Sequence, residues 1–125
     1  MTYRARLEEL KTAFARLKEA KTSTNNQLEK DGVIQRFEFV FELVWKTIKD
    51  YAEDRGRMDA VSPKDAFRVA ADLSLIEDPL PWFEFLKSRN EATHLYDEQK
   101  AEEVYDHIPE FIHAVEILIA KISNS

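Results

Sequence analysis

Residues 31–51 read DGVIQRFEFVFELVWKTIKDY and set the architecture of the whole chain. Apolar side chains recur in this stretch every three or four residues, which is the spacing of one face of an α-helix. That face is wide enough for the centre of a helical bundle, and it consists of Val33, Ile34, Phe37, Val40, Phe41, Val44, Trp45 and Ile48. We therefore predict a central helix over Leu28–Asp54.

The rest of the chain shows the same helical spacing and no run of strand-like alternation. Ser62-Pro63 and Asp78-Pro79 each combine an N-cap residue with proline at the first helical position. Further helices are expected over Tyr3–Lys21, Pro63–Leu73, Pro79–Arg89 and Glu98–Ile122, with a polar linker over Thr22–Gln27. The sequence thus predicts an all-α protein, an up-and-down bundle of four to five helices in a single domain, residues 1–125.

Two apolar residues do not belong to the inward face of the central helix. Phe39 and Leu43 lie one turn apart on the opposite side, among polar residues such as Glu42. An exposed pair of apolar side chains on adjacent turns is expected to be buried by packing against another apolar surface. Either a second copy of the chain packs on it in a dimer, or another helix of the same bundle does.

Composition excludes several classes of protein. The chain has no cysteine, so it forms neither a disulfide nor a thiolate metal site. We find no basic-then-apolar secretion signal and no apolar run near the roughly 20 residues that span a bilayer. The expected location is the cytoplasm, with no part played by a membrane.

The charge balance restricts any contact with nucleic acid to a local patch. The chain carries 18 basic and 24 acidic residues, a net charge of -6, which works against broad electrostatic capture of RNA or DNA. Most basic residues are expected to be ordinary solvated surface. The candidates for a local basic patch are Arg55, Arg57, Lys64, Arg68, Lys87 and Arg89.

One short run gathers the chemically useful side chains. Residues 88–96 read SRNEATHLY, with an arginine, an amide, an imidazole and a phenol at the end of the fourth predicted helix. On that helix Trp82, Phe83 and Leu86 form an apolar stripe, and Arg89, Asn90 and Thr93 are expected to continue it inward. A half-buried guanidinium requires acceptors, which predicts a cleft, a partner or a bound anion there.

Other chemistries lack their residues. Glu-x-x-His occurs at Glu91/His94 and at Glu110/His113, as in di-iron bundles, but Glu91, Glu110 and His113 are predicted to point away from the core. Nucleophilic triads and phosphate-binding glycine loops are absent. We expect no metal and no cofactor.

Arg-x4-His, with Asn90 directly after Arg89 and Tyr96 two residues past His94, resembles the signature of the HepT-like branch of the HEPN superfamily. The stretch 31–51 resembles the second-helix signature of chains described as nucleotidyltransferase substrate-binding proteins. The two segments occur in the order and separation of that family, and the resemblance extends over nearly the whole chain. The resemblance implies a HEPN-like bundle similar to the C-terminal helical domain of kanamycin nucleotidyltransferase.

The resemblance also implies a function. It implies a homodimer that forms a toxin-antitoxin pair with a minimal nucleotidyltransferase encoded by an adjacent gene, and that cleaves RNA such as tRNA without a metal. In that family pattern Arg89 and His94 are catalytic, Asn90 supports them, and Tyr96 is the residue that the partner enzyme adenylylates.

Two alternatives remain at this stage. In the first alternative, the bundle is a non-catalytic subunit that binds substrate for, or regulates, a nucleotidyltransferase complex. Otherwise Arg89 and His94 form only local ion pairs at a helix end, with Glu91, Asp97 or an acidic group on the last helix.

Overall fold

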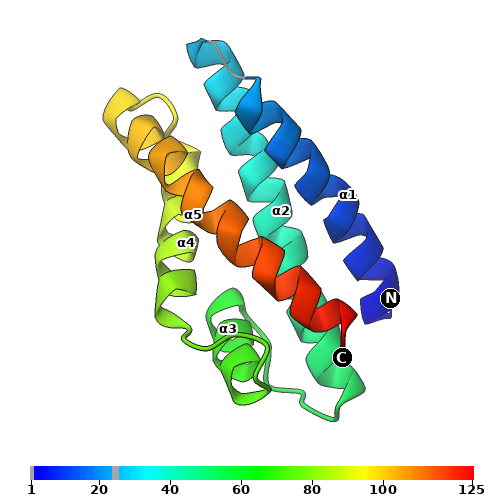
Figure 1. Ribbon diagram of the computed structural model, residues 1–125. Helices are drawn as coiled ribbons and strands as arrows, with labels where there is room; N and C mark the ends of the chain where they lie inside the picture. The colour runs from blue at the N-terminus through cyan, green and yellow to red at the C-terminus, as the bar shows by residue number, and fades with distance from the viewer. Residues whose placement is uncertain (1, 24–25) are drawn as a thin grey trace.

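The computed structural model describes residues 2–23 and 26–125, which form five α-helices and contain no strand. In Figure 1, α1 rises from the N-terminus, α2 descends beside it, α3 and α4 form a third arm, and α5 returns. The all-α, up-and-down bundle is therefore confirmed. The elements are α1 (Tyr3–Thr22), α2 (Gln27–Asp54), α3 (Pro63–Asp72), α4 (Leu80–Glu91), a short 3-10 helix η1 (Ala92–His94) and α5 (Glu98–Ser123).

The helices begin near the predicted signals. Ser62 caps α3 as expected, because its Oγ accepts a hydrogen bond from the Asp65 backbone N–H at 3.2 Å. α4 starts one residue later than predicted, and Asp78 Oδ1 accepts from the Leu80 N–H at 2.9 Å. Residues 24 and 25 of the expected linker lie outside the described part of the chain.

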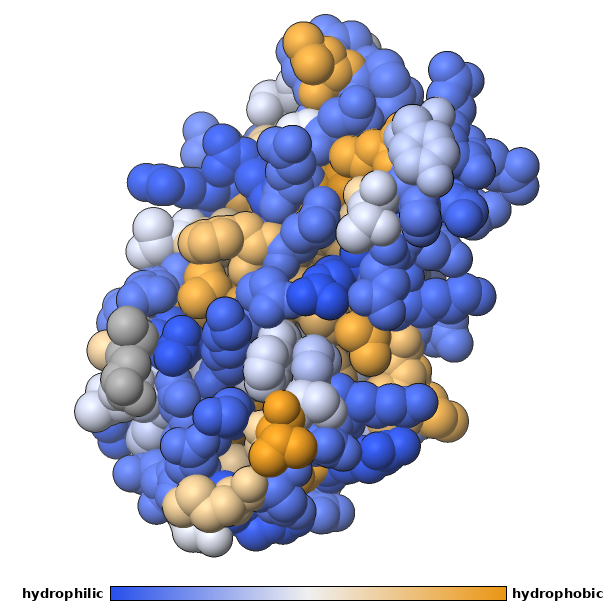
Figure 2. All heavy atoms as spheres, turned by 180° about the vertical axis from the view of Figure 1, so that it is seen from behind, coloured by the Kyte–Doolittle hydropathy of each residue, from blue (hydrophilic) through white to orange (hydrophobic). Residues whose placement is uncertain are grey.

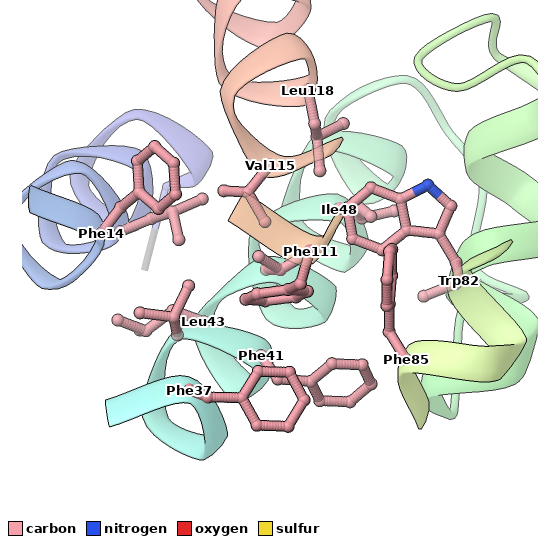
Figure 3. Packing of buried hydrophobic residues seen from close by; sticks show 14 of the residues in the cluster. Phe14, Phe37, Phe41, Leu43, Ile48, Trp82, Phe85, Phe111, Val115 and Leu118 are labelled. Atoms are coloured by element: carbon pink, nitrogen blue, oxygen red, sulfur yellow. The ribbon is translucent and has the colours of Figure 1, made fainter. Parts of the chain in front are cut away.

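The core is a cluster of aromatic rings centred on Phe111 of α5. The ring centroid of Phe111 lies 4.8 Å from that of Phe37 on α2 and 5.3 Å from that of Phe85 on α4. Both pairs are edge-to-face, a favourable ring geometry. Figure 3 shows these rings and Trp82 converging from three helices, so the cluster fixes how α4 is rotated against α2 and α5.

The apolar pair on the outer side of α2 separates into two different environments. Leu43 is only 6% exposed and belongs to the same buried core as Phe14 of α1, so ordinary helix packing covers it. Phe39 remains 61% exposed, in an open groove of about 460 Å³ between α1 and α2. Of the two alternatives, packing by another helix of the bundle holds for Leu43, whereas nothing in the described part of the chain covers Phe39 to the same extent.

One face of the molecule is mainly polar. Figure 2 shows a largely hydrophilic face on which apolar side chains appear as separate small patches. Within the described residues, no helix combines the length and the apolar character that a bilayer crossing requires.

α2 and α3 each end in a turn of the same backbone conformation. After α2, Gly56 adopts φ 80° and the Arg57 N–H bonds the Ala52 carbonyl at 2.9 Å. After α3, Ser74 adopts φ 61° and the Leu75 N–H bonds the Ala70 carbonyl at 2.9 Å. This closure needs a left-handed residue, which glycine adopts without strain and serine does not.

The two glycines give opposite predictions for the same chemical change. Gly56→Ala should lower the free energy of unfolding by about 1 kcal/mol, since alanine is strained at positive φ. Gly32→Ala, inside α2 with open space around the new methyl group, should raise it by roughly 0.5–1 kcal/mol. Urea unfolding measures both, and a stabilising Gly56→Ala would contradict the turn geometry.

Candidate functional site

The aromatic core fixes which side of α4 faces inward. Trp82, Phe85 and Ser88 are its buried residues, and Ala92 follows them in η1. The predicted stripe of Trp82, Phe83 and Leu86 was therefore wrong in phase, since Phe83 and Leu86 are only half-buried. The cause is Phe111, whose ring selects Phe85 as the inward aromatic residue of this helix.

This rotation decides where the polar run of α4 points. Arg89 is half-buried, as the sequence predicted, but Asn90 and Thr93 are exposed. The expectation that these two continue an inward stripe was wrong for the same reason of helix phase. The guanidinium of Arg89 turns toward α2, where it lies 5.7 Å from the ring centroid of Phe41.

Arg89 forms an ion pair with Glu42 of α2. Its Nη2 donates to Glu42 Oε1, and its Nη1 donates to Asn90 Oδ1 at 3.2 Å. The other Glu42 oxygen accepts from the indole N–H of Trp45 at 3.0 Å. An ion pair does form at this helix end, but its partner lies on α2 rather than among the local acidic groups or on α5.

Glu42 was missed by sequence reasoning. It lies 47 residues from Arg89 along the chain and outside the apolar face that defined α2. The signal that could have found it is the requirement for an acceptor near a half-buried guanidinium.

A second carboxylate lies near Arg89. Burial raises the pKa of Glu38, one turn before Glu42, and the positive charge of Arg89 partly opposes this increase. Arg89 is thus set against two acidic side chains on successive turns of α2. An anionic ligand must compete with them for the guanidinium.

His94 ends η1 and is held by Tyr96. Its Nδ1 lies 2.9 Å from the hydroxyl oxygen of Tyr96, and the two rings meet edge-to-face with centroids 5.6 Å apart. Tyr96 itself is 83% exposed. This hydrogen bond uses Nδ1 and does not involve the Nε2 atom of His94.

His94 lines an open hollow of about 320 Å³ beside α4. Asn90 lines the same hollow, whereas Arg89 does not. In the described residues no hydrogen bond joins Arg89 to His94. A single copy of the chain therefore presents the imidazole and the guanidinium on neighbouring but separate surfaces, with Asn90 between them.

A hydrogen bond from Ser88, the residue before Arg89, joins α4 to α5. Ser88 Oγ and His107 Nδ1 are 2.7 Å apart, and the His107 ring packs on Phe85 with centroids 4.9 Å apart. His107 is half-buried, and this contact helps to hold α4 in place.

Metal ligands do not gather in this part of the molecule. Across residues 2–23 and 26–125, no group of three histidine, aspartate or glutamate side chains is placed to hold an ion.

Comparison with known proteins places the chain among helical relatives. A family model described as nucleotidyltransferase substrate binding protein like matches residues 5–124. A Haemophilus influenzae protein named probable ribonuclease HepT is 38% identical over 85 residues, which are 65% of this chain and 58% of that protein. The chain thus matches less than two thirds of the length of this relative.

Two solved structures have the same fold. A protein of Thermus thermophilus matches with a TM-score of 0.82 and 28% identity, over 90% of this chain and 97% of that one. A Haemophilus influenzae protein, described as having the fold of a substrate binding domain of a nucleotidyltransferase, matches with a TM-score of 0.78 and 27% identity. That match covers 94% of this chain and 98% of the other.

Glu38→Gln should raise the free energy of unfolding at pH 7 and have little effect well below pH 4.5, the ordinary pKa of the group. Because the folded state holds the Glu38 proton more tightly than the unfolded chain, native stability falls as pH rises through this range. Urea unfolding across pH 4–8 measures the effect. The exposed Glu9→Gln is the matched control for loss of one negative charge. A Glu38→Gln protein less stable at pH 7 would contradict the assignment.

Proposed function

The chain belongs to the nucleotidyltransferase substrate binding protein like family, and we propose that within it this protein is a metal-independent endoribonuclease of the HEPN type. The observation that carries the proposal is His94, held at Nδ1 and open at Nε2, in a hollow next to the half-buried Arg89. Support comes from the 38% identity with a protein named probable ribonuclease.

The side chains supply what RNA cleavage by the neighbouring 2'-hydroxyl requires. A base removes the proton of that hydroxyl, its oxygen attacks the phosphorus, and the 5'-oxygen leaves with a proton from an acid. His94 serves as base and as acid. Arg89, once released from Glu42, binds the phosphate through two N–H donors and stabilises its developing charge.

Tyr96 permits both roles of His94. When the Tyr96 hydroxyl accepts from Nδ1–H, Nε2 carries a free electron pair and acts as base. When His94 is protonated on both nitrogens, Nδ1–H still donates to the Tyr96 hydroxyl, and Nε2–H acts as acid. The same hydrogen bond of 2.9 Å therefore serves either half of the reaction.

The active unit is a homodimer. One protomer holds Arg89 outside the hollow that His94 lines, and the α2 side that carries Glu42 also carries the exposed Phe39 three residues earlier. Packing a second copy on this side covers Phe39 and brings two arginines and two histidines to one cleft. One His94 then acts as base while the other acts as acid.

The partner is a minimal nucleotidyltransferase encoded by an adjacent gene, in a toxin-antitoxin pair. Tyr96 is its target, since the hydroxyl lies on a side chain that is 83% exposed. In adenylylation the Tyr96 oxygen attacks the α-phosphorus of ATP, loses its proton and displaces pyrophosphate. The added group removes the hydrogen bond to His94 and covers the hollow, which silences the nuclease.

A second function is favoured by one comparison. The Haemophilus influenzae structure is described as having the fold of a substrate binding domain of a nucleotidyltransferase, which supports a non-catalytic role in such a complex. In that role Arg89 and the hollow bind an anion without turnover. A stable complex with the nucleotidyltransferase and no RNA cleavage by the free protein would favour this function.

Cleavage is tested with the purified full chain, tRNA or mRNA, and EDTA. We expect cuts that leave a 2',3'-cyclic phosphate, and His94→Ala or Arg89→Ala should slow them by about 10²–10⁴-fold. The matched control is His113→Ala, an exposed histidine on α5 outside the hollow, which should cut as the native chain does. Equal rates for His94→Ala and His113→Ala would contradict the proposal.

Modification is tested by incubating the protein with the nucleotidyltransferase and ATP. Mass spectrometry should locate one adenylyl group on Tyr96, and RNA cleavage should be lost with the same time course. Tyr96→Phe should gain no label and should keep its own cleavage rate through the incubation. A complex in which Tyr96 stays unmodified would contradict the regulatory part of the proposal and favour the binding subunit.

A further inference from the structure

Most arginines of the predicted basic patch are neutralised by carboxylates. Arg57 donates to both oxygens of Asp59 at 3.0 and 2.8 Å and to Asp72 at 3.1 Å. Those contacts raise the pKa of Arg57 above its ordinary value. Three more ion pairs join Arg55 to Asp54, Arg68 to Asp65 and Arg89 to Glu42. Arg55, Arg57 and Arg68 are therefore poor candidates for binding phosphate, whereas Arg89 binds it only after release from Glu42.

Three lysines near the site are different. Lys64 begins α3, Lys87 lies on α4 and Lys100 lies in the first turn of α5. None has a carboxylate within ion-pair distance among the residues that the structure describes. In a chain with a net charge of -6, unpaired cations on three different helices form a local positive surface. We call Lys64, Lys87 and Lys100 the lysine strip.

The strip is continuous with the hollow that holds His94. Lys87 and Lys100 line this hollow together with His94. Lys64 joins them through Phe83, since its Nζ lies 5.1 Å from the Phe83 ring centroid and Phe83 lines the hollow. The positive charges therefore extend from the imidazole along one side of α4.

The hollow also has an apolar wall. Phe83 and Leu86 form this wall, while Glu91 is the acidic side chain in the lining. Cations beside an apolar wall match a nucleotide strand, because its phosphates require positive charge and its unstacked bases require apolar surface. An acidic peptide would use the cations but would leave the apolar wall without a partner.

We propose that the lysine strip binds the backbone of single-stranded RNA on either side of the phosphate that His94 attacks, with a base against Phe83 and Leu86. This inference rests on the proposed function, because it places the scissile phosphate at His94. It adds the residues that bind the substrate and explains how an acidic protein holds RNA. The local positive surface compensates for the unfavourable net charge.

The test measures binding of a fluorescein-labelled single-stranded RNA 12-mer by anisotropy at several salt concentrations. The full chain carries His94→Ala so that the RNA stays intact. For each phosphate that a variant no longer binds, the slope of log affinity against log salt should fall in magnitude by about 0.7. Lys87→Ala and Lys100→Ala should each show this decrease, and the double variant should show both.

Lys121→Ala is the matched control. It removes the same charge from another lysine without an ion pair among the described residues, near the far end of α5 and outside the hollow. Its affinity and slope should equal those of the parent chain. Thermal unfolding of each variant confirms that the fold is kept, since Lys87 is exposed and Lys100 is half-buried.

The outcomes separate this inference from the proposed function. If Lys87→Ala and Lys100→Ala bind RNA as Lys121→Ala does, the lysine strip is refuted even when the native chain cuts RNA. If the two lysine variants bind RNA normally but no longer bind the nucleotidyltransferase, the surface recognises a protein and the inference is also refuted. If they lose RNA binding while the native chain never cuts, the strip is supported and the nuclease proposal fails.

Discussion

The packing of Phe111 against α2 and α4 is the contact on which the rest of the site depends. Aromatic residues bury large apolar areas, and their edge-to-face pairs add a preference for particular ring positions. Phe85 and Trp82 meet Phe111 in this way, which fixes the rotation of α4. That rotation in turn sends Arg89 toward α2 and leaves Asn90 and His94 at the outer surface. The Ser88–His107 contact at 2.7 Å strengthens the same arrangement one residue before Arg89.

The positive charge of Arg89 is held beside carboxylates of α2. Arg89 lies against Glu42 and near Glu38, so its charge is largely compensated inside one protomer. The Arg89 and Glu42 side chains are 31% and 30% exposed, and ion pairs at such partly exposed positions contribute modestly to stability. A phosphodiester, whose single negative charge is shared by two oxygens, can therefore displace Glu42 at small cost. His94 has no such competitor, since its hydrogen bond to Tyr96 occupies only Nδ1.

The sequence predicted the helices well because periodicity and caps are local properties. The α2 face from Val33 to Ile48 is found in the structure except for Trp45, which is only half-buried, and Ser62 caps α3 as predicted. The phase of α4 was not predictable in the same way, since its apolar residues occupy four of five positions from 82 to 86 and fit more than one stripe. Only contact with Phe111 selects among them. The Glu42 partner of Arg89 and the burial of Leu43 likewise depend on residues far away in the chain.

The central claim is that two subunits meet with Arg89 and His94 of each around one cleft. The chain has no cysteine, so a spin label on Thr93→Cys, an exposed position next to His94, reports the distance between subunits without background. Pulsed electron paramagnetic resonance should give one defined distance for this label, shorter than that for a label on Lys121→Cys at the far end of α5. No dipolar coupling at either position, or a longer distance at Thr93 than at Lys121, would contradict the account.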